Sequence, residues 1–206
     1  MLIDNNINKL NWDQPNGLIP TIIQHKISGQ ILMHAFMNKI ALNMTLKNKK
    51  VTFFSRKRNT LWTKGETSGN FLQVDSILTD CDQDTLLILV NPIHKTCHLN
   101  TYSCFKSTMI PNFTFLYILE QFLNNRKNVK SITKSYTYNL YKSGTKRISQ
   151  KVGEEAIETI IAANHNNKQE IIEETSDLLY HLIILLQSQN IKINDIIQML
   201  QKRNSF

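Results

Sequence analysis

All three cysteines of this 206-residue chain lie in one short stretch, interleaved with aspartates and followed by a histidine. The stretch opens with Asp80-Cys81-Asp82-Gln83-Asp84, and Cys97, His98 and Cys104 follow. Thiolates are the usual protein ligands of zinc, whereas carboxylates suit a hard cation such as magnesium. Three protein ligands leave one zinc coordination position for water, as in catalytic sites. The residue types therefore favour a catalytic zinc site beside a site for a harder cation.

A second set of acidic residues recurs at helical spacing near the C-terminus. Residues three or four apart share one helix face, so Glu155 pairs with Glu158, and Glu174 pairs with Asp177. The short connection 164–168 predicts that the two helices are antiparallel neighbours. If the pairs face each other, their like charges need a cation such as magnesium. A solvated acidic face is the alternative, but the dense apolar residues around these acids favour partial burial.

Two further stretches carry groups that can bind phosphate. Residues 126–151 contain eight Lys or Arg and no acid, which fits a polyphosphate substrate, a nucleic acid or a solvated basic face. Residues 55–70 combine cations, hydroxyls, two glycines and Trp62, on which a purine can stack. An ordinary hairpin loop is the alternative for this second stretch.

The elements that must position these groups divide the chain into two domains, 1–110 and 111–206. The N-terminal domain is expected to be α+β with a mostly antiparallel sheet, and Asp80–Asp84 to be the turn between two strands. Residues 1–17 resemble a polar leader, and Asn38 is expected to cap a helix that ends near Asn48. The expected strands are Ile19–Gln24, Gln30–Phe36, Val51–Phe54, Phe71–Thr79 and Thr85–Val90.

Beyond Pro111 the strand pattern disappears and an all-α domain is expected. Its core is modest at about ninety residues, which favours association with a second copy. Asn194 or Asp195 is expected to cap the last helix. The expected helices are Phe115–Leu123, Lys146–His165, Lys168–Gln189 and Asn194–Lys202.

Charge, apolar stretches and cysteine content indicate in which compartment the protein is expected. The formal net charge is +8, the N-terminus has no signal-peptide pattern, and the longest apolar stretch, Leu178–Leu186, is too short to span a bilayer. Three cysteines cannot all pair within one chain, so free or metal-bound thiols in a reducing cytoplasm are expected.

The two halves resemble two enzyme families. From about Gly17 to Phe105 the chain resembles phosphoribosyl-AMP cyclohydrolase, through Ser55-Arg56-x-Arg58, Leu61 to Asn70, Asp80 to Asp84, Cys97-His98 and Ser103-Cys104-Phe105. From about Phe115 it resembles phosphoribosyl-ATP pyrophosphohydrolase, through Ser135-Tyr136-Thr137, Lys151 to Glu158 and Asp177 to His181. The Glu-x-x-Glu pattern is shared with the wider helical (MazG-like) nucleotide pyrophosphohydrolases. Together the halves resemble the bifunctional family of histidine biosynthesis.

This resemblance implies two consecutive hydrolyses. The helical domain would cleave phosphoribosyl-ATP between its α and β phosphates and release pyrophosphate. The N-terminal domain would then open the adenine ring of phosphoribosyl-AMP at its N1–C6 bond with a zinc-bound hydroxide. In the family the cyclohydrolase is a homodimer with zinc ligands from both chains, and no nucleic-acid or membrane partner is expected.

The resemblance also implies roles for single residues. Zinc would bind to Cys81, Cys97 and Cys104, and magnesium to Asp80, Asp82 and Asp84. In the helical domain the groups that bind magnesium or orient water would be Glu154, Glu155, Glu158, Glu174 and Asp177. The catalytic candidates are His98, chosen by position, with Glu155 and Glu158. The substrate-binding candidates are Arg56, Arg58, Trp62, Lys64, Glu66, Ser68, Asn70 and Lys151.

Two alternatives remain open at the level of sequence. A non-enzymatic zinc module with a helical interaction domain would need a fourth zinc ligand and would tolerate amides in place of the helical acids. A related deaminase or nucleotide-clearing pyrophosphatase is the narrower alternative, although such an enzyme has no need of the Trp62–Asn70 stretch.

Overall fold

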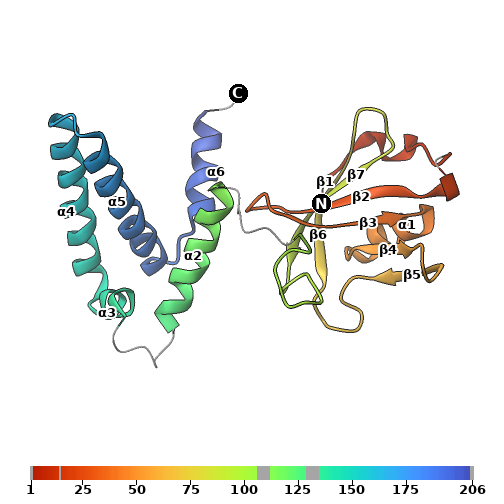
Figure 1. The fold of residues 1–206 in the computed structure, drawn as a ribbon, viewed down its shortest axis with the longest axis horizontal. Helices are drawn as coiled ribbons and strands as arrows, with labels where there is room; N and C mark the ends of the chain where they lie inside the picture. Colours follow the sequence, from red (N-terminus) through yellow and green to blue (C-terminus); the bar gives the residue numbers. More distant parts are fainter. Residues whose placement is uncertain (1, 14, 106–111, 129–134, 205–206) are drawn as a thin grey trace. The chain divides into compact units, whose positions relative to one another are not determined.

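The computed structural model describes residues 2–13, 15–105, 112–128 and 135–204. The chain forms two compact units that divide between Phe115 and Leu116, each with a hydrophobic core of its own (Figure 1). The expected order, an α+β unit followed by an all-helical unit, is confirmed. The expected boundary between residues 110 and 111 lies outside the described residues.

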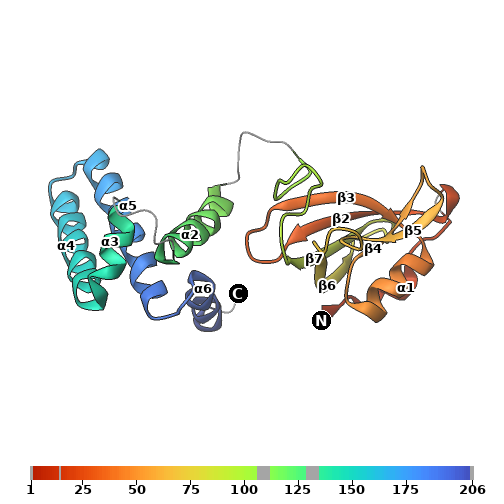
Figure 2. The ribbon, with the colours of Figure 1, turned by 90° about the horizontal axis from the view of Figure 1, so that it is seen from below.

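A five-stranded mixed sheet in the order β1-β6-β7-β2-β3 forms the N-terminal unit (Figure 2). Two antiparallel pairs, β2–β3 and β6–β7, are joined through parallel pairing of β2 with β7, and β1 adds to β6 in parallel. A separate antiparallel hairpin is formed by β4 and β5. The strands are β1 (Leu2–Ile3), β2 (Ile19–His25), β3 (Ile31–Met37), β4 (Thr52–Ser55), β5 (Thr60–Thr63), β6 (Leu72–Thr79) and β7 (Leu86–Pro92).

Alternating side chains of these strands supply the core. Ile19 and Ile23 of β2 and Ile88 of β7 are fully buried, with Phe53 of β4 beside them. Helix α1 (Lys39–Asn48) also packs on this core. The Asn38 side chain accepts a hydrogen bond from the Ala41 amide at 2.8 Å, which confirms the expected cap.

The described residues of this first segment, 2–13 and 15–17, are part of the fold, so their interpretation as a leader is wrong. Leu2 and Ile3 pair with β6, and a 3-10 helix (Asn5–Lys9) follows. The Asp4 carboxylate accepts hydrogen bonds from the amide and hydroxyl of Thr79, at 3.1 and 2.8 Å. Leu10 is buried in the core. The hydrogen bonds from Thr79 to Asp4 thus hold this polar segment against β6, although its sequence has no strand pattern.

The helical unit contains α3 (Tyr136–Lys142), α4 (Gly144–Asn164), α5 (Lys168–Ser188), α6 (Ile193–Arg203) and most of α2 (Asn112–Asn128). Helices α4 and α5 lie side by side and antiparallel, as expected (Figure 1). Helix α3 was not predicted; Ser135 caps it through the Tyr138 amide. No described helix is long and apolar enough to cross a membrane.

The expected cap of the last helix is wrong by a few residues. Lys192 is the N-cap of α6, and Asp195 is the third helical residue. The Asp195 carboxylate accepts a hydrogen bond from the Lys192 amide at 2.9 Å. It therefore acts from inside the first turn, as the reciprocal partner in a capping box does.

Candidate active sites

The turn between β6 and β7 brings together the oxygens of Asp80, Asp82 and Asp84, all within 4.8 Å of one another. Asp80 accepts hydrogen bonds from the amides of Asp84 and Thr85, at 3.0 and 2.9 Å. Desolvation raises the pKa of Asp80, but these donors outweigh it and lower the pKa. The Thr85 hydroxyl lowers the pKa of Asp84, but desolvation and the charges of Asp82 and Asp80 outweigh it and raise the pKa. The crowded carboxylates fit the oxygen ligands of a divalent cation.

Cys97 and Cys104 lie together on the connection after β7. The Cys104 amide donates to the Leu32 carbonyl of β3 at 2.7 Å, which fixes this connection on the outer edge of the sheet. Hydrogen bonds from the Leu99 backbone and from Thr101 lower the pKa of the Cys97 thiol. Burial and the neighbouring Cys97 raise the pKa of Cys104 to about 11. The pair thus combines one thiol of lowered pKa with one of raised pKa.

Two other side chains accompany this thiol pair. Nδ1 of His98 lies 3.9 Å from Sγ of Cys97, so the histidine ring is next to the thiol pair that was expected to bind zinc. The positive charge of Lys64 favours the thiolate form of both cysteines. It adds to the lowering of the Cys97 pKa and offsets part of the rise in the Cys104 pKa.

Cys81 does not join the other two thiols within one chain. It follows β6, whereas Cys104 lies against β3, and three strand spacings separate these strands, roughly 14 Å. Zinc–sulfur bonds are only about 2.3 Å long, so one ion cannot bind to all three sulfurs of a single chain. The closeness of the cysteines in the sequence is misleading because β7 carries the chain from one end of the sheet to the other.

The stretch of residues 55–70 forms two turns at opposite ends of β5. Arg56 and Arg58 lie in the turn of the β4–β5 hairpin, and the Arg56 guanidinium lies 3.8 Å from the ring centroid of Phe36. Trp62 packs against Phe53, with ring centroids 5.0 Å apart, so it is part of the edge of the core. The first of these turns is thus a hairpin turn, as the alternative interpretation held, and phosphate binding by this stretch stays a prediction.

The turn after β5 is tight and internally hydrogen-bonded. Gly65 has a φ of +94°, and a Cβ at this position would lie 2.5 Å from the backbone of Asn70 and Phe71. The Glu66 carboxylate accepts from the Thr63 amide at 2.9 Å, and Ser68 accepts from the Asn70 amide at 3.3 Å. The close approach that needs a glycine is therefore made by the chain to its own backbone.

In the helical unit, Glu155, Glu158 and Glu174 converge, with oxygens within 4.8 Å of one another. Glu155 is only 5% exposed, so it is not on a solvated face. Desolvation, followed by the charges of Glu158, Glu155 and Asp177, raises the pKa of Glu174. Crowded carboxylates raise one another's pKa in this way. We call these three residues the acid centre.

Lys151 connects the acid centre to Glu154. Its Nζ lies 2.7 Å from the Glu155 carboxylate and 3.0 Å from that of Glu154, and these hydrogen bonds raise the pKa of Lys151. Glu154 also accepts from Arg147 and Gln150, and the Lys151 hydrogen bond lowers its pKa. The structure thus places Glu154 in an ion-pair network beside the acid centre. Asp177 lies outside the three-carboxylate group.

A contact that the sequence did not predict supports the acid centre from α3. The Nε2 of His181 lies 2.8 Å from the Tyr136 hydroxyl, while its Nδ1 lies 2.8 Å from the Asp177 carbonyl and 3.6 Å from Glu155. His181 is buried. Tyr136 precedes it by 45 residues, and only the Ser135-Tyr136-Thr137 motif indicated that this stretch matters.

Comparison with known proteins assigns the two units. Residues 33–106 match the phosphoribosyl-AMP cyclohydrolase family, and residues 116–204 match the phosphoribosyl-ATP pyrophosphohydrolase family. The histidine biosynthesis bifunctional protein HisIE of Escherichia coli (strain K12) is 53% identical over 204 residues, which are 99% of this chain and 100% of that protein. The chain belongs to the HisIE family. The HisIE proteins of Buchnera aphidicola subsp. Schizaphis graminum and Photobacterium profundum are 55% and 51% identical, over 97% of this chain and 96% and 98% of theirs.

As a member of the HisIE family, the chain is a hydrolase of histidine biosynthesis with two activities. The cyclohydrolase match contains the aspartate turn and all three cysteines, and the pyrophosphohydrolase match contains the acid centre with Lys151 and His181. Each cluster of chemically active residues therefore lies in the unit to which one activity belongs. This assignment excludes the alternative of a non-enzymatic zinc module.

Proposed function

We propose that the acid centre performs the first reaction, the hydrolysis of phosphoribosyl-ATP to phosphoribosyl-AMP and pyrophosphate. Glu155, Glu158 and Glu174 hold magnesium, which neutralises phosphate charge when bound. Lys151 fixes the buried Glu155 carboxylate through its 2.7 Å ion pair and adds a positive charge beside the phosphates. The carboxylates also orient the water that attacks between the α and β phosphates. Asp177 and Glu154 add negative charge next to them, Asp177 beside Glu174 and Glu154 in the ion pair with Lys151.

The N-terminal unit performs the second reaction, in which water adds at C6 of the adenine ring and the N1–C6 bond opens. The thiols of Cys97 and Cys104 are the zinc ligands of one chain, and the donors around Cys97 that lower its pKa favour metal binding. Zinc supplies the Lewis acidity that makes water a nucleophile near neutral pH. His98, 3.9 Å from the Cys97 sulfur, moves the proton as general acid and base.

The third zinc ligand, Cys81, comes from a second copy of the chain. The separation of Cys81 from the other thiols supports this assembly, because a symmetric dimer places each aspartate turn at the other copy's thiol pair. Asp80, Asp82 and Asp84 would hold magnesium beside the same site, and a bound magnesium would supply positive charge for the substrate phosphate. Arg56, Arg58, Trp62 and Lys64 are the proposed substrate contacts, with Glu66, Ser68 and Asn70 maintaining the turn after β5.

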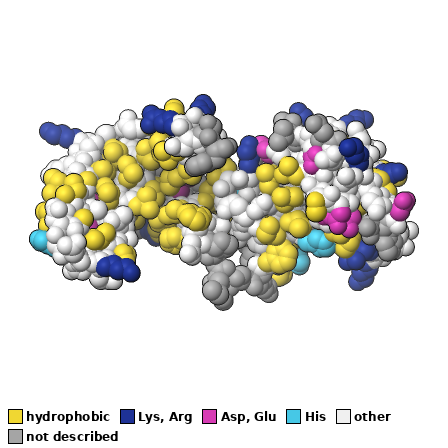
Figure 3. Space-filling model, turned by 90° about the horizontal axis from the view of Figure 1, so that it is seen from above, with side chains coloured by type: hydrophobic (Ala, Val, Ile, Leu, Met, Phe, Trp, Pro, Cys, Tyr) yellow, Lys and Arg dark blue, Asp and Glu magenta, His cyan; other side chains and the backbone are white. Residues whose placement is uncertain are grey.

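The helical unit also offers surface for a second copy. Helix α6 has no buried residue among those described, and Ile196, Ile197, Met199 and Leu200 are all exposed. On α4, Ile157 and Ile160 are about 60% exposed. Figure 3 shows hydrophobic side chains gathered over the visible face of this unit. Apolar surface of this extent supports assembly of two copies. The three free thiols suit a reducing compartment, the cytoplasm.

The observation that carries the proposal is that the N-terminal unit holds a thiol pair and an aspartate turn, whereas the helical unit holds a separate cluster of three glutamates. The test is a time course of the purified chain with phosphoribosyl-ATP, magnesium and zinc. Pyrophosphate should appear first, followed by the ring-opened formimino product. Chelation of zinc should stop only the second product. Loss of both products on selective zinc removal would contradict the assignment of zinc to the N-terminal unit alone.

A further inference from the structure

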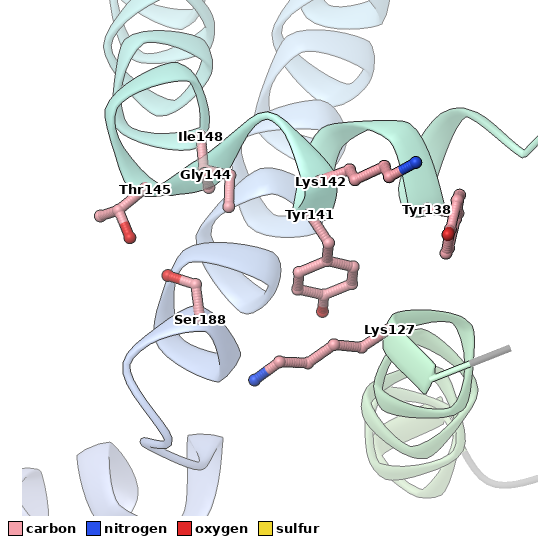
Figure 4. A pocket seen from close by; sticks show the side chains of 8 residues that line it. All are labelled: Lys127, Tyr138, Tyr141, Lys142, Gly144, Thr145, Ile148 and Ser188. Carbon is pink, nitrogen blue, oxygen red and sulfur yellow. The ribbon is translucent and has the colours of Figure 1, made fainter. Parts of the chain in front are cut away.

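A pocket of about 400 Å³ lies in the helical unit where α4 begins and α5 ends (Figure 4). It is separate from the acid centre: Thr145 in its wall and Glu155 are ten residues apart on α4, or roughly 15 Å along the helix axis. Side chains from α2, α3, α4 and α5 converge on it. Those that matter here are Lys127, Tyr138, Tyr141, Lys142, Thr145 and Ser188.

The pocket has the charge and hydrogen-bonding groups of an anion site. Of the described residues that line it, two are lysines and none is acidic. Lys127 donates to the Gln187 carbonyl at 3.1 Å, which holds its ammonium at the pocket and leaves further N–H donors. The Lys142 ammonium lies 5.7 Å from the centroid of the Tyr138 ring. Thr145 accepts a hydrogen bond from Gln189 at 3.0 Å, so its own O–H remains able to donate.

Helix α3 connects this pocket to the acid centre. Tyr136, at its first turn, contacts His181 beside Glu155, and Lys142, at its last residue, lines the pocket. Phosphoribosyl-ATP has a matching layout. Its reacting triphosphate is at one end and the phosphate of its second ribose at the other. A ribose, an adenine ring and another ribose lie between them.

The need to distinguish phosphoribosyl-ATP from ATP is a reason for a second binding site beside the acid centre. The triphosphate end of the substrate is the same as in ATP, so the acid centre cannot distinguish the two compounds by that end. Discrimination must come from groups that recognise the phosphoribosyl end. The pocket, roughly 15 Å from the acid centre along α4, carries two lysines that can provide such groups.

We propose that this pocket binds the phosphate monoester of the phosphoribosyl group and so selects phosphoribosyl-ATP over ATP. The inference rests on the proposed role of the acid centre. A free nucleoside monophosphate would offer the same phosphate chemistry, and the experiment below separates the two sources. Binding of the substrate at both ends also orients the phosphoanhydride at the acid centre.

The test compares Lys142→Gln and Lys127→Gln with the control Lys146→Gln, which removes the same charge from a nearby exposed residue that does not line the pocket. Loss of a charged hydrogen bond should raise the KM for phosphoribosyl-ATP about tenfold or more in the first two variants. Inhibition of the reaction by ATP, which lacks the phosphoribosyl end, should be the same in all three variants. An unchanged KM in Lys142→Gln, which is exposed and not expected to affect folding, would overturn the proposal.

A binding measurement separates the possible ligands. Ribose 5-phosphate should shift the amide NMR signals of Gly144 and Thr145 in the full chain, and Lys142→Gln should abolish the shift. Inorganic phosphate should bind more weakly. If the signals shift but the KM for phosphoribosyl-ATP does not change in the variants, the pocket binds a free phosphate compound and the assignment to the substrate is wrong. Glu155→Gln, measured in parallel, reports separately on the acid centre.

Discussion

The Glu155 carboxylate in α4 lies 2.7 Å from the Nζ of Lys151 one turn earlier, although only 5% of Glu155 is exposed. Burial of a carboxylate is costly unless it is paired, and this ion pair provides the compensation. Glu158 and Glu174 add two further carboxylates within 4.8 Å. A single lysine that also pairs with Glu154 cannot balance three acids. The acid centre therefore retains a negative charge that a divalent cation would compensate.

Adjacent glutamates on α5 provide a matched test of that centre. Glu174 belongs to the acid centre, whereas the neighbouring Glu173 is exposed and accepts a hydrogen bond from Gln169. Glu174→Gln should reduce pyrophosphate release about a hundredfold, since a charged ligand to the cation is lost. Glu173→Gln should remain near the wild-type rate. Steady-state assays over a magnesium titration distinguish these outcomes, and equal effects of the two changes would refute the assignment.

The shared zinc site predicts complementation between inactive variants. Cys81→Ser and Cys97→Ser should each lack ring opening alone. A mixture should regain about a quarter of the wild-type rate, because half of the dimers are mixed and one of their two sites is intact. The measurement is the ring-opening assay after the variants have been unfolded and refolded together. A mixture of Cys97→Ser with Cys104→Ser is the control and should stay inactive, since both changes affect the same half of the site.

Two glycines after β5 differ in how much space surrounds them. A Cβ at Gly65 would meet backbone atoms at 2.5 Å, whereas at Gly69 nothing lies within 4 Å. Both have positive φ, so alanine at Gly69 should cost about 1–2 kcal/mol of unfolding free energy from backbone strain alone. Gly65→Ala should cost about 3 kcal/mol, because the turn must also open. Urea unfolding followed by fluorescence of Trp12 and Trp62, which both lie in the N-terminal unit, measures the difference.

His25 at the end of β2 predicts how the N-terminal unit responds to acid. Its Nδ1 accepts hydrogen bonds from the amides of Ile27 and Ser28, at 3.1 and 3.0 Å, and burial lowers its pKa below the usual 6.5. The unfolded chain therefore binds a proton before the folded chain does. The stabilisation that comes from neutral His25 should be fully present above about pH 6.5, the pKa in the unfolded chain. It should be lost as the pH falls through the lower pKa of His25 in the folded chain.

The control for this response is His25→Asn, whose side-chain oxygen can accept the same amides but does not titrate. The urea midpoint from tryptophan fluorescence should fall more between pH 7.5 and 5.5 in the wild type than in the variant. An equal fall in both proteins would assign the acid response to other groups.

Local signals predicted most of the elements. Asn38 caps α1 as expected, and the five expected strands are present with ends that differ by no more than two residues. These features depend on neighbouring residues, which a sequence displays directly. Strand β5 was missed although it pairs with the adjacent β4, but the first segment and α3 were missed because they depend on distant partners. Asp4 holds the first segment through Thr79, and α3 is short and held through Tyr136 and Thr137 to residues of α5.

The candidate sites show the same limit. Helical spacing correctly placed Glu155, Glu158 and Glu174 on facing helices, because a short loop leaves few alternatives. The cysteines seemed to form one cluster, but sheet topology separates Cys81 from Cys97 and Cys104. Trp62 packs against its cross-strand neighbour Phe53 at the edge of the core, a contact that the sequence did not show, and its stacking on a purine stays a prediction. Register and strand order, which a single sequence does not display, decided these cases.

The most direct test of two independent centres measures both reactions in two variants of the full chain. Cys97→Ser should release pyrophosphate from phosphoribosyl-ATP at the wild-type rate and accumulate phosphoribosyl-AMP without ring opening. Glu155→Gln should release no pyrophosphate yet open the ring of added phosphoribosyl-AMP normally. Circular dichroism and tryptophan fluorescence confirm that both variants are folded. Loss of both reactions in either folded variant would contradict the assignment of one hydrolysis to each unit.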